Sequence, residues 1–138
     1  MTIASAVLED VVAHARECQP LECCGILLGH PSHIVAVVRA RNIADQPNAR
    51  FLIDPKDHID ARRTARARQL DVIGFYHSHP HSHAHPSTTD LAEATYRECV
   101  HLIVGIVEGV PEVRMFSYAE GRATELSFDI YPAPRTPG

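Results

Sequence analysis

The feature that most constrains this chain is an apolar, β-rich run that leads directly into a histidine-rich segment. Val72–His77 is typical of a buried central strand, and it continues as Ser78-His79-Pro80-His81-Ser82-His83-Ala84-His85-Pro86-Ser87-Thr88-Thr89-Asp90. Pro80 ends the strand, while Ser87 and Asp90 have the spacing of a helix N-cap and a residue of the first helical turn. The fold must therefore bring a strand end and a helix start together.

These two ends carry side chains that bind metals. His77 and His79 are two residues apart, so in a strand both point to one face and Ser78 points to the other. Asp90 returns on the first turn of a helix, where the helix dipole favours a carboxylate. Such a nitrogen and oxygen set suits zinc better than calcium, magnesium or copper(I). Three ligands leave one tetrahedral position for a water nucleophile, so we expect one catalytic Zn²⁺ per chain.

Two more residues complete a hydrolytic site. The Ser87 hydroxyl can accept a capping hydrogen bond and still donate its proton to the oxyanion of a tetrahedral intermediate. Glu22 comes just before the apolar run Cys23–Gly29. If that run forms a strand beside Val72–His77, the Glu22 carboxylate can act as general base and general acid. The sequence alone does not show this adjacency.

Length and charge narrow the class of protein. The chain has 138 residues, enough for one domain with a real core, and a net charge of −4, which gives no electrostatic footprint for nucleic acid or an anionic membrane. Its N-terminus has the pattern of neither a secretory signal nor a membrane span, so we expect a cytoplasmic protein. Four cysteines without CxxC spacing indicate buried small apolar residues, with a second metal site at Cys18 and Cys23 as the alternative.

Hydrophobic periodicity predicts an α/β protein with a single mixed β-sheet flanked by helices. We expect helices over 3–18, 55–70 and 87–99, with Asp54 and Pro55 starting the second, and strands over 23–29, 33–40, 51–53, 72–77, 101–107, 113–118 and 124–130. Four arginines of the second helix, between Arg62 and Arg68, indicate a solvated face or a docking surface for an acidic partner. Residues 1–131 form the expected domain, and 132–138 a proline-rich disordered tail.

The candidate site residues and their spacing resemble the characteristic motif of the JAMM (MPN+) zinc metalloproteases. That motif has an upstream glutamate, then His-x-His-Pro, a short loop and Pro-Ser-x-x-Asp, which here are Glu22, His77-Ser78-His79-Pro80 and Pro86–Asp90. The resemblance implies an MPN/JAMM-like, cytidine-deaminase-like fold. It also implies that His77, His79 and Asp90 bind zinc, that Glu22 is the general acid/base and that Ser87 assists the oxyanion.

The same resemblance implies an activity and a substrate class. JAMM enzymes are isopeptidases that hydrolyse an amide bond next to the C-terminus of a ubiquitin-like protein, and short prokaryotic members act on ubiquitin-like sulfur carriers. The shortness of the chain favours the prokaryotic type. We expect no nucleic-acid or membrane partner, and a homodimer is compatible with the sequence. His81, His83 and His85 are not part of the family pattern, and they indicate either a solvated loop or a second, weaker metal site.

Two other functions compete with a zinc peptidase. A non-catalytic MPN-type scaffold or a metal-binding protein built around the His-rich loop would bind several ions without turnover. The His-x-His-Pro and Pro-Ser-x-x-Asp pattern also resembles RadC-like proteins, which are linked to DNA repair by name. The negative net charge argues against the nucleic-acid function.

Overall fold

A single mixed β-sheet organises the chain, of which the computed structural model describes residues 1–92 and 98–132. Within these residues the sheet has eight strands and is accompanied by three helices. In chain order the elements are β1 Thr2–Ala4, α1 Ser5–Cys18, β2 Cys24–His30, β3 His33–Ala40, α2 Pro55–Ala67, β4 Asp71–His79, α3 Thr88–Ala92, β5 Val100–Val107, β6 Val110–Ala119, β7 Arg122–Leu126 and β8 Asp129–Tyr131.

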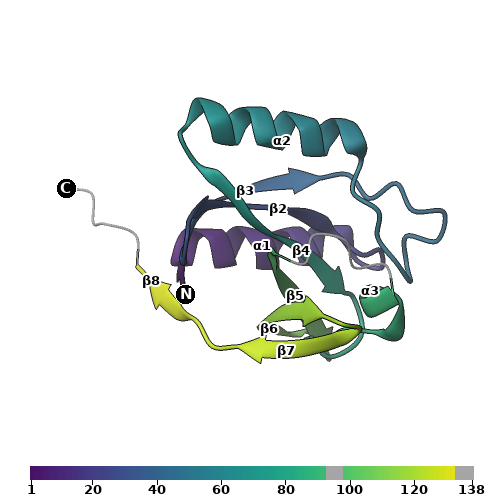
Figure 1. The fold of residues 1–138 in the computed structure, drawn as a ribbon. Helices are drawn as coiled ribbons and strands as arrows, with labels where there is room; N and C mark the ends of the chain where they lie inside the picture. The colour runs from purple at the N-terminus through teal and green to yellow at the C-terminus, as the bar shows by residue number, and fades with distance from the viewer. Residues whose placement is uncertain (93–97, 133–138) are drawn as a thin grey trace, which may run out of the picture.

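Helices α1 and α2 cover opposite faces of the sheet (Figure 1). The alternation of side chains along β2 shows this division, because Cys23 and Leu27 pack in the core beneath α1 while Cys24 and Ile26 pack in the core beneath α2. The adjacent Cys23 and Cys24 therefore point to opposite faces of the sheet, and all four cysteines of the chain are free. On β4, the side chain of Tyr76 packs in the core beneath α1.

The sheet curls so strongly that its two edges are joined by a short piece of chain. The strand order is β7-β6-β5-β4-β2-β3-β1-β8, so β7 and β8 lie at opposite edges although only two residues separate them in sequence. Figure 1 shows β8 beside the N-terminus, where it pairs in parallel with β1. A link of three peptide units spans at most about 11 Å, which forces the edges toward each other.

Strand β4 has the interior place that the sequence predicts for the run Val72–His77. It pairs antiparallel with β2 and parallel with β5, and Cys24 lies opposite His77 in the first of these pairs. This pairing supplies the adjacency on which the role of Glu22 depends, because Glu22 lies just beyond Cys24 at the end of β4 that carries the histidines.

Several element boundaries differ from the sequence prediction. Residues 2–4 form β1 instead of the start of the first helix, because β3 and β8 offer them partners on both sides. The predicted strand 51–53 is reduced to one bridge between Asn42 and Ile53. The predicted strand 124–130 is divided into β7 and β8, which pair with different neighbours.

The remaining boundaries agree to within a few residues. Helix α2 begins at Pro55 as predicted, and the Asp54 carboxylate caps it by accepting the Lys56 N–H at 2.8 Å, but the helix ends at Ala67 rather than near residue 70. The third helix is described only over Thr88–Ala92, and the rest of its predicted span includes residues 93–97, outside the described part. The predicted disordered tail lies almost wholly outside it too, at 133–138. Among the described helices, none has the length and apolar character needed to cross a membrane.

Candidate metal centre

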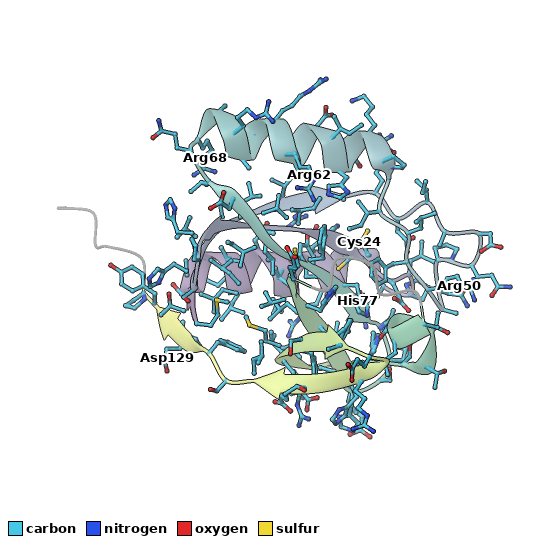
Figure 2. All side chains as sticks on the ribbon, viewed as in Figure 1. Cys24, Arg50, Arg62, Arg68, His77 and Asp129 are labelled. Atoms are coloured by element: carbon cyan, nitrogen blue, oxygen red, sulfur yellow. The ribbon has the colours of Figure 1, made fainter. Side chains whose placement is uncertain are left out.

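Three side chains from β4 and α3 converge on one point at the C-terminal end of the interior strand β4. The Nε2 atoms of His77 and His79 are 3.2 Å apart, and the Asp90 Oδ2 atom lies 3.1 Å from each of them. All three residues are buried, with at most 9% of their surface exposed. The convergence that the spacing predicts is therefore present in the structure, and Figure 2 shows His77 in the interior of the molecule below α2.

The strand geometry fixes which way each histidine points. Ser78, between them, faces the opposite side of β4, where its Oγ atom accepts the backbone N–H of Cys23 at 2.8 Å. The His79 Nδ1–H donates to the carbonyl of His83 at 2.9 Å, because a carbonyl oxygen can only accept. This bond places the proton of His79 on Nδ1 and leaves the Nε2 lone pair directed at the cluster.

Phe51 holds the other histidine. Its ring stacks on His77 with a centroid separation of 4.3 Å and an interplanar angle of 17°. Sequence reasoning missed this contact: the pattern of residues 51–53 indicates only a short strand, and local pattern does not show that this segment lies against β4. An aromatic residue just before a well-capped helix was the only available signal.

Asp90 is fixed by a reciprocal cap. The Asp90 N–H donates to Ser87 Oγ and the Ser87 N–H donates to Asp90 Oδ2, both at 2.9 Å. This confirms the predicted capping-box-like start of α3. The Ser87 hydroxyl accepts in this arrangement, so its own proton is available for a second group.

The electrostatics of the cluster favour a neutral histidine beside an ionised carboxylate. Burial lowers the pKa of His77, and the neighbouring Asp90 opposes that shift without overcoming it. For His79, burial is outweighed by the adjacent Asp90 carboxylate and by the hydrogen bond to the His83 carbonyl, so its pKa is raised. Burial opposes ionisation of Asp90, but the two adjacent imidazoles and the Ser87 N–H hold its pKa well below the usual range. The cluster thus keeps a negative oxygen among imidazole nitrogens.

These residues fit a transition-metal ion. Three ligand atoms, one from each side chain, lie within 4.8 Å of one another. Ligands bonded to zinc at about 2.0–2.1 Å in a tetrahedron lie about 3.3–3.4 Å apart, close to the 3.1 Å and 3.2 Å separations found here. In residues 1–92 and 98–132 this is the only group of at least three such residues placed to share an ion.

Within the described residues, none of the residues considered for a second metal site belongs to a group of three or more side chains placed to share an ion: His81, His83, His85, Cys18 and Cys23. His83 approaches Glu112 at 3.6 Å, and His85 faces the guanidinium of Arg114 at 3.0 Å, so these two imidazoles face opposite charges rather than each other. Burial raises the pKa of the Cys23 thiol to about 12, which disfavours the thiolate that a Cys18–Cys23 metal site would require.

Glu22 lies beside the cluster as the strand pairing requires. It is 6% exposed, and it lines a cleft of about 270 Å³ together with His79 and Ser87. Asn42 fixes the backbone of Glu22, since its Nδ2 atom donates to the Glu22 carbonyl at 3.1 Å and to the Arg50 carbonyl at 3.0 Å. Asn42 was not singled out from the sequence.

A second, larger cleft opens on the other side of the cluster. Its volume is about 710 Å³, and His77 and Asp90 form part of its wall. Most of the remaining lining is apolar or aromatic and comes from the 43–53 loop and from β4 and β6: Ile43, Phe51, Leu52, Ile53, Phe75 and Tyr118. Within the described residues the buried Tyr118 hydroxyl has no hydrogen-bond partner. The three clustered side chains therefore separate a small polar cleft from a large apolar one.

Comparison with known proteins places this geometry in context. The sequence model of a family described as prokaryotic homologs of the JAB domain matches residues 4–118, which include all five predicted site residues. A desampylase from Haloferax volcanii is 31% identical over 109 residues, covering 75% of this chain and 78% of the relative. A probable TtuB-protein conjugate cleaving protease from Thermus thermophilus is 28% identical over 124 residues, covering 90% of this chain and 80% of that protein.

Solved structures agree with the fold. The solution structure of protein DSY2949 from Desulfitobacterium hafniense is 26% identical and superposes with a TM-score of 0.87 over 96% of this chain and 93% of the other. The mixed sheet and flanking helices expected from the sequence are thereby confirmed.

Proposed function

Because the chain belongs to the family of prokaryotic homologs of the JAB domain, we propose that it is a zinc-dependent peptidase or isopeptidase. Its substrate is an amide bond at the C-terminus of a ubiquitin-like or sulfur-carrier protein. The observation that carries this proposal is the convergence of His77, His79 and Asp90 beside Glu22 and Ser87. The relatives from Haloferax and Thermus, named for removing or cleaving protein conjugates, support the substrate class.

Each residue has a defined part in this reaction. His77, His79 and Asp90 would hold one Zn²⁺, which would supply a Lewis acid for the scissile carbonyl and lower the pKa of a water. The Glu22 carboxylate takes a proton from the attacking water and passes it to the leaving amine nitrogen. The Ser87 Oγ–H donates to the oxyanion while the same oxygen keeps its bond from the Asp90 N–H.

The two clefts suit a substrate that extends on both sides of the scissile bond. The cleft of about 710 Å³ is large enough for several side chains, and its apolar lining suits hydrophobic residues of a flexible C-terminal tail. Burial and the nearby Asp90 raise the pKa of Tyr118, so its hydroxyl remains a donor for a polar group of the substrate. The smaller cleft, with Glu22 and Ser87, receives the leaving amine.

The decisive experiment combines metal analysis with a cleavage panel. Ubiquitin-like and sulfur-carrier proteins, each extended at the C-terminus by one amino acid, a peptide or an isopeptide-linked chain, are incubated with the zinc-loaded protein. We expect cleavage of at least one of them, and a loss of about 100-fold or more in rate for Glu22→Gln with zinc content unchanged. Cleavage at the wild-type rate by Glu22→Gln would remove Glu22 from the mechanism.

A matched variant controls for the loss of one carboxylate. Glu120 lies in the exposed turn between β6 and β7, so Glu120→Gln changes net charge equally without touching the cluster. It should bind zinc and cleave at the wild-type rate. Absence of cleavage across the whole panel by a zinc-loaded wild-type protein would instead favour the scaffold function.

A further inference from the structure

A row of three residues crosses the sheet next to the metal centre. In the register of the strands, His79 of β4 lies opposite Gly105 of β5, and Gly105 lies opposite Glu112 of β6. The middle position carries no side chain, so the row has a notch between an imidazole and a carboxylate. A Cβ atom on Gly105 would overlap the backbone of Ser82, His83 and Ala84.

The His-rich loop fills this notch with a single peptide group. Ala84 is fully buried and packs against Ile103 and Phe116, which draws the loop down onto the sheet. The carbonyl of His83 accepts the His79 Nδ1–H at 2.9 Å, and the N–H of Ala84, on the other side of the same peptide group, donates to Glu112 Oε1 at 3.0 Å. The peptide thus connects the imidazole on one side to the carboxylate on the other.

The direction of these bonds makes them reinforce each other. A carboxylate that accepts from the N–H end of a peptide increases the negative charge on its carbonyl oxygen, which then accepts more strongly. A stronger acceptor at Nδ1 orients the imidazole and makes its Nε2 atom a better donor to a metal. Glu112 is well suited to this, because its bond to the Ala84 N–H lowers its pKa and keeps it ionised.

We propose that Glu112 is a positioning residue for the metal centre, acting on His79 through the His83–Ala84 peptide in the notch of Gly105. Glu112 itself touches neither the cluster nor either cleft in the contacts described above. It lies on β6, 22 residues after Asp90 in the sequence and outside the five residues of the predicted site. The His-rich loop accordingly serves as a structural bridge, and its backbone rather than its imidazoles does this work. The inference rests on the zinc site of the proposed function.

Zinc affinity of purified variants tests this role directly, measured by competition with a chromophoric chelator at pH 7.5. Glu112→Ala removes both the acceptor and the charge, and we expect zinc to bind about 10-fold more weakly. Glu112→Gln retains an oxygen acceptor without the charge and should lie between Ala and wild type. Zinc affinity should therefore decrease in the order wild type, Glu112→Gln, Glu112→Ala. A simple loss of packing would weaken binding only in Glu112→Ala, because glutamine keeps the size of glutamate.

Glu125 provides the matched control. Like Glu112 it faces Arg114, with Glu125 Oε1 at 3.7 Å from that guanidinium, but it makes no bond to the loop. Glu125→Ala should bind zinc with wild-type affinity, so equal weakening by Glu125→Ala and Glu112→Ala would assign the effect to Arg114 and overturn the proposal. Wild-type affinity in Glu112→Ala would overturn it as well.

A second measurement guards against a variant that folds poorly. In the NMR spectrum of the zinc-loaded wild type, we expect the His79 Nδ1–H to give a slowly exchanging imidazole signal. In Glu112→Gln, whose side chain keeps its size, this proton should exchange faster while the amide signals of β4 stay in place. An unchanged exchange rate would count against the bridge. A wild type that binds no zinc would defeat the proposed function itself, and so the two failures are distinguishable.

Discussion

At the residue scale, the contact between Phe51 and His77 leads to a first prediction. Stacked aromatic pairs contribute about 0.5–1.5 kcal/mol beyond burial, so losing the Phe51 ring should weaken zinc binding by about 2- to 10-fold. We expect this for Phe51→Ala in the same chelator competition. The neighbouring Leu52 is 55% exposed, and Leu52→Ala should leave the affinity unchanged. Equal effects from both substitutions would point to the loop and not to the ring.

Ser87 allows its two roles to be separated. A Ser87→Asp variant keeps an N-cap acceptor for the Asp90 N–H but has no proton to donate, whereas Ser87→Thr keeps both. We expect Asp to preserve thermal stability and to lower kcat about 100-fold or more, and Thr to retain most of the activity. If Ser87→Asp cleaved substrate at the wild-type rate, the hydroxyl would be only a cap.

The residues of the candidate site were predictable to different degrees. His77, His79 and Asp90 are specified by local geometry, because strand alternation and a helix cap place them within 13 residues of one another. Glu22 needed a pairing between β2 and β4 that no local pattern reveals. Phe51, Asn42 and Glu112 were not predicted at all, because their contacts depend on how a loop and a distant strand lie against the site.

At the scale of elements, boundaries were predictable where turn chemistry is local. Strand β3 has the bounds expected from the sequence, and α2 begins at the proline that follows its capping aspartate. The errors occur where a distant partner decides. Residues 2–4 have apolar spacing compatible with a helix, but β3 and β8 draw them into the sheet. The division between β7 and β8 likewise follows from pairing at opposite edges.

The pairing of β2 with β4 depends on one close approach. Gly25 lies opposite Tyr76, and a Cβ atom there would overlap the tyrosine ring. We expect Gly25→Ala to destabilise the protein by about 1–3 kcal/mol, the usual cost of overpacking a core, as measured by urea unfolding. In a Tyr76→Ala background the same substitution should cost clearly less, because the ring is gone. Equal costs in both backgrounds would place the strain elsewhere.

At the scale of the whole molecule, the cluster depends on three separate parts of the fold. The sheet supplies the histidines, the α2 face carries the large apolar cleft, and the loop over β5 fixes His79 from outside. Figure 2 labels Arg62 on α2 and Arg68 at the end of this helix, and both residues are exposed. The four arginines between Arg62 and Arg68 are exposed, as both the solvated face and the docking surface considered from the sequence require. The buried metal centre therefore lies beneath α2, whose exposed arginines form the surface above it.

Stability of the metal-free protein should depend on pH through His14, which lies on the α1 side of the sheet, opposite the face to which His77 points. His14 is buried beneath the sheet with its Nδ1 atom 2.7 Å from the Tyr76 hydroxyl, and burial and Arg39 lower its pKa from 6.5. As pH falls below about 6.5, the unfolded chain takes up a proton that the folded protein does not. Unfolding is thereby favoured, so the free energy of unfolding should be lower at pH 5.5 than at pH 7.5.

A substitution isolates this contribution from those of other histidines. His14→Gln keeps a polar partner for the Tyr76 hydroxyl but does not titrate. The difference in unfolding free energy between pH 7.5 and pH 5.5, measured by urea denaturation in the presence of a chelator, should be smaller in the variant than in the wild type. An equal or larger difference would show that His14 binds its proton as readily in the folded protein as in the unfolded chain, contrary to its buried position.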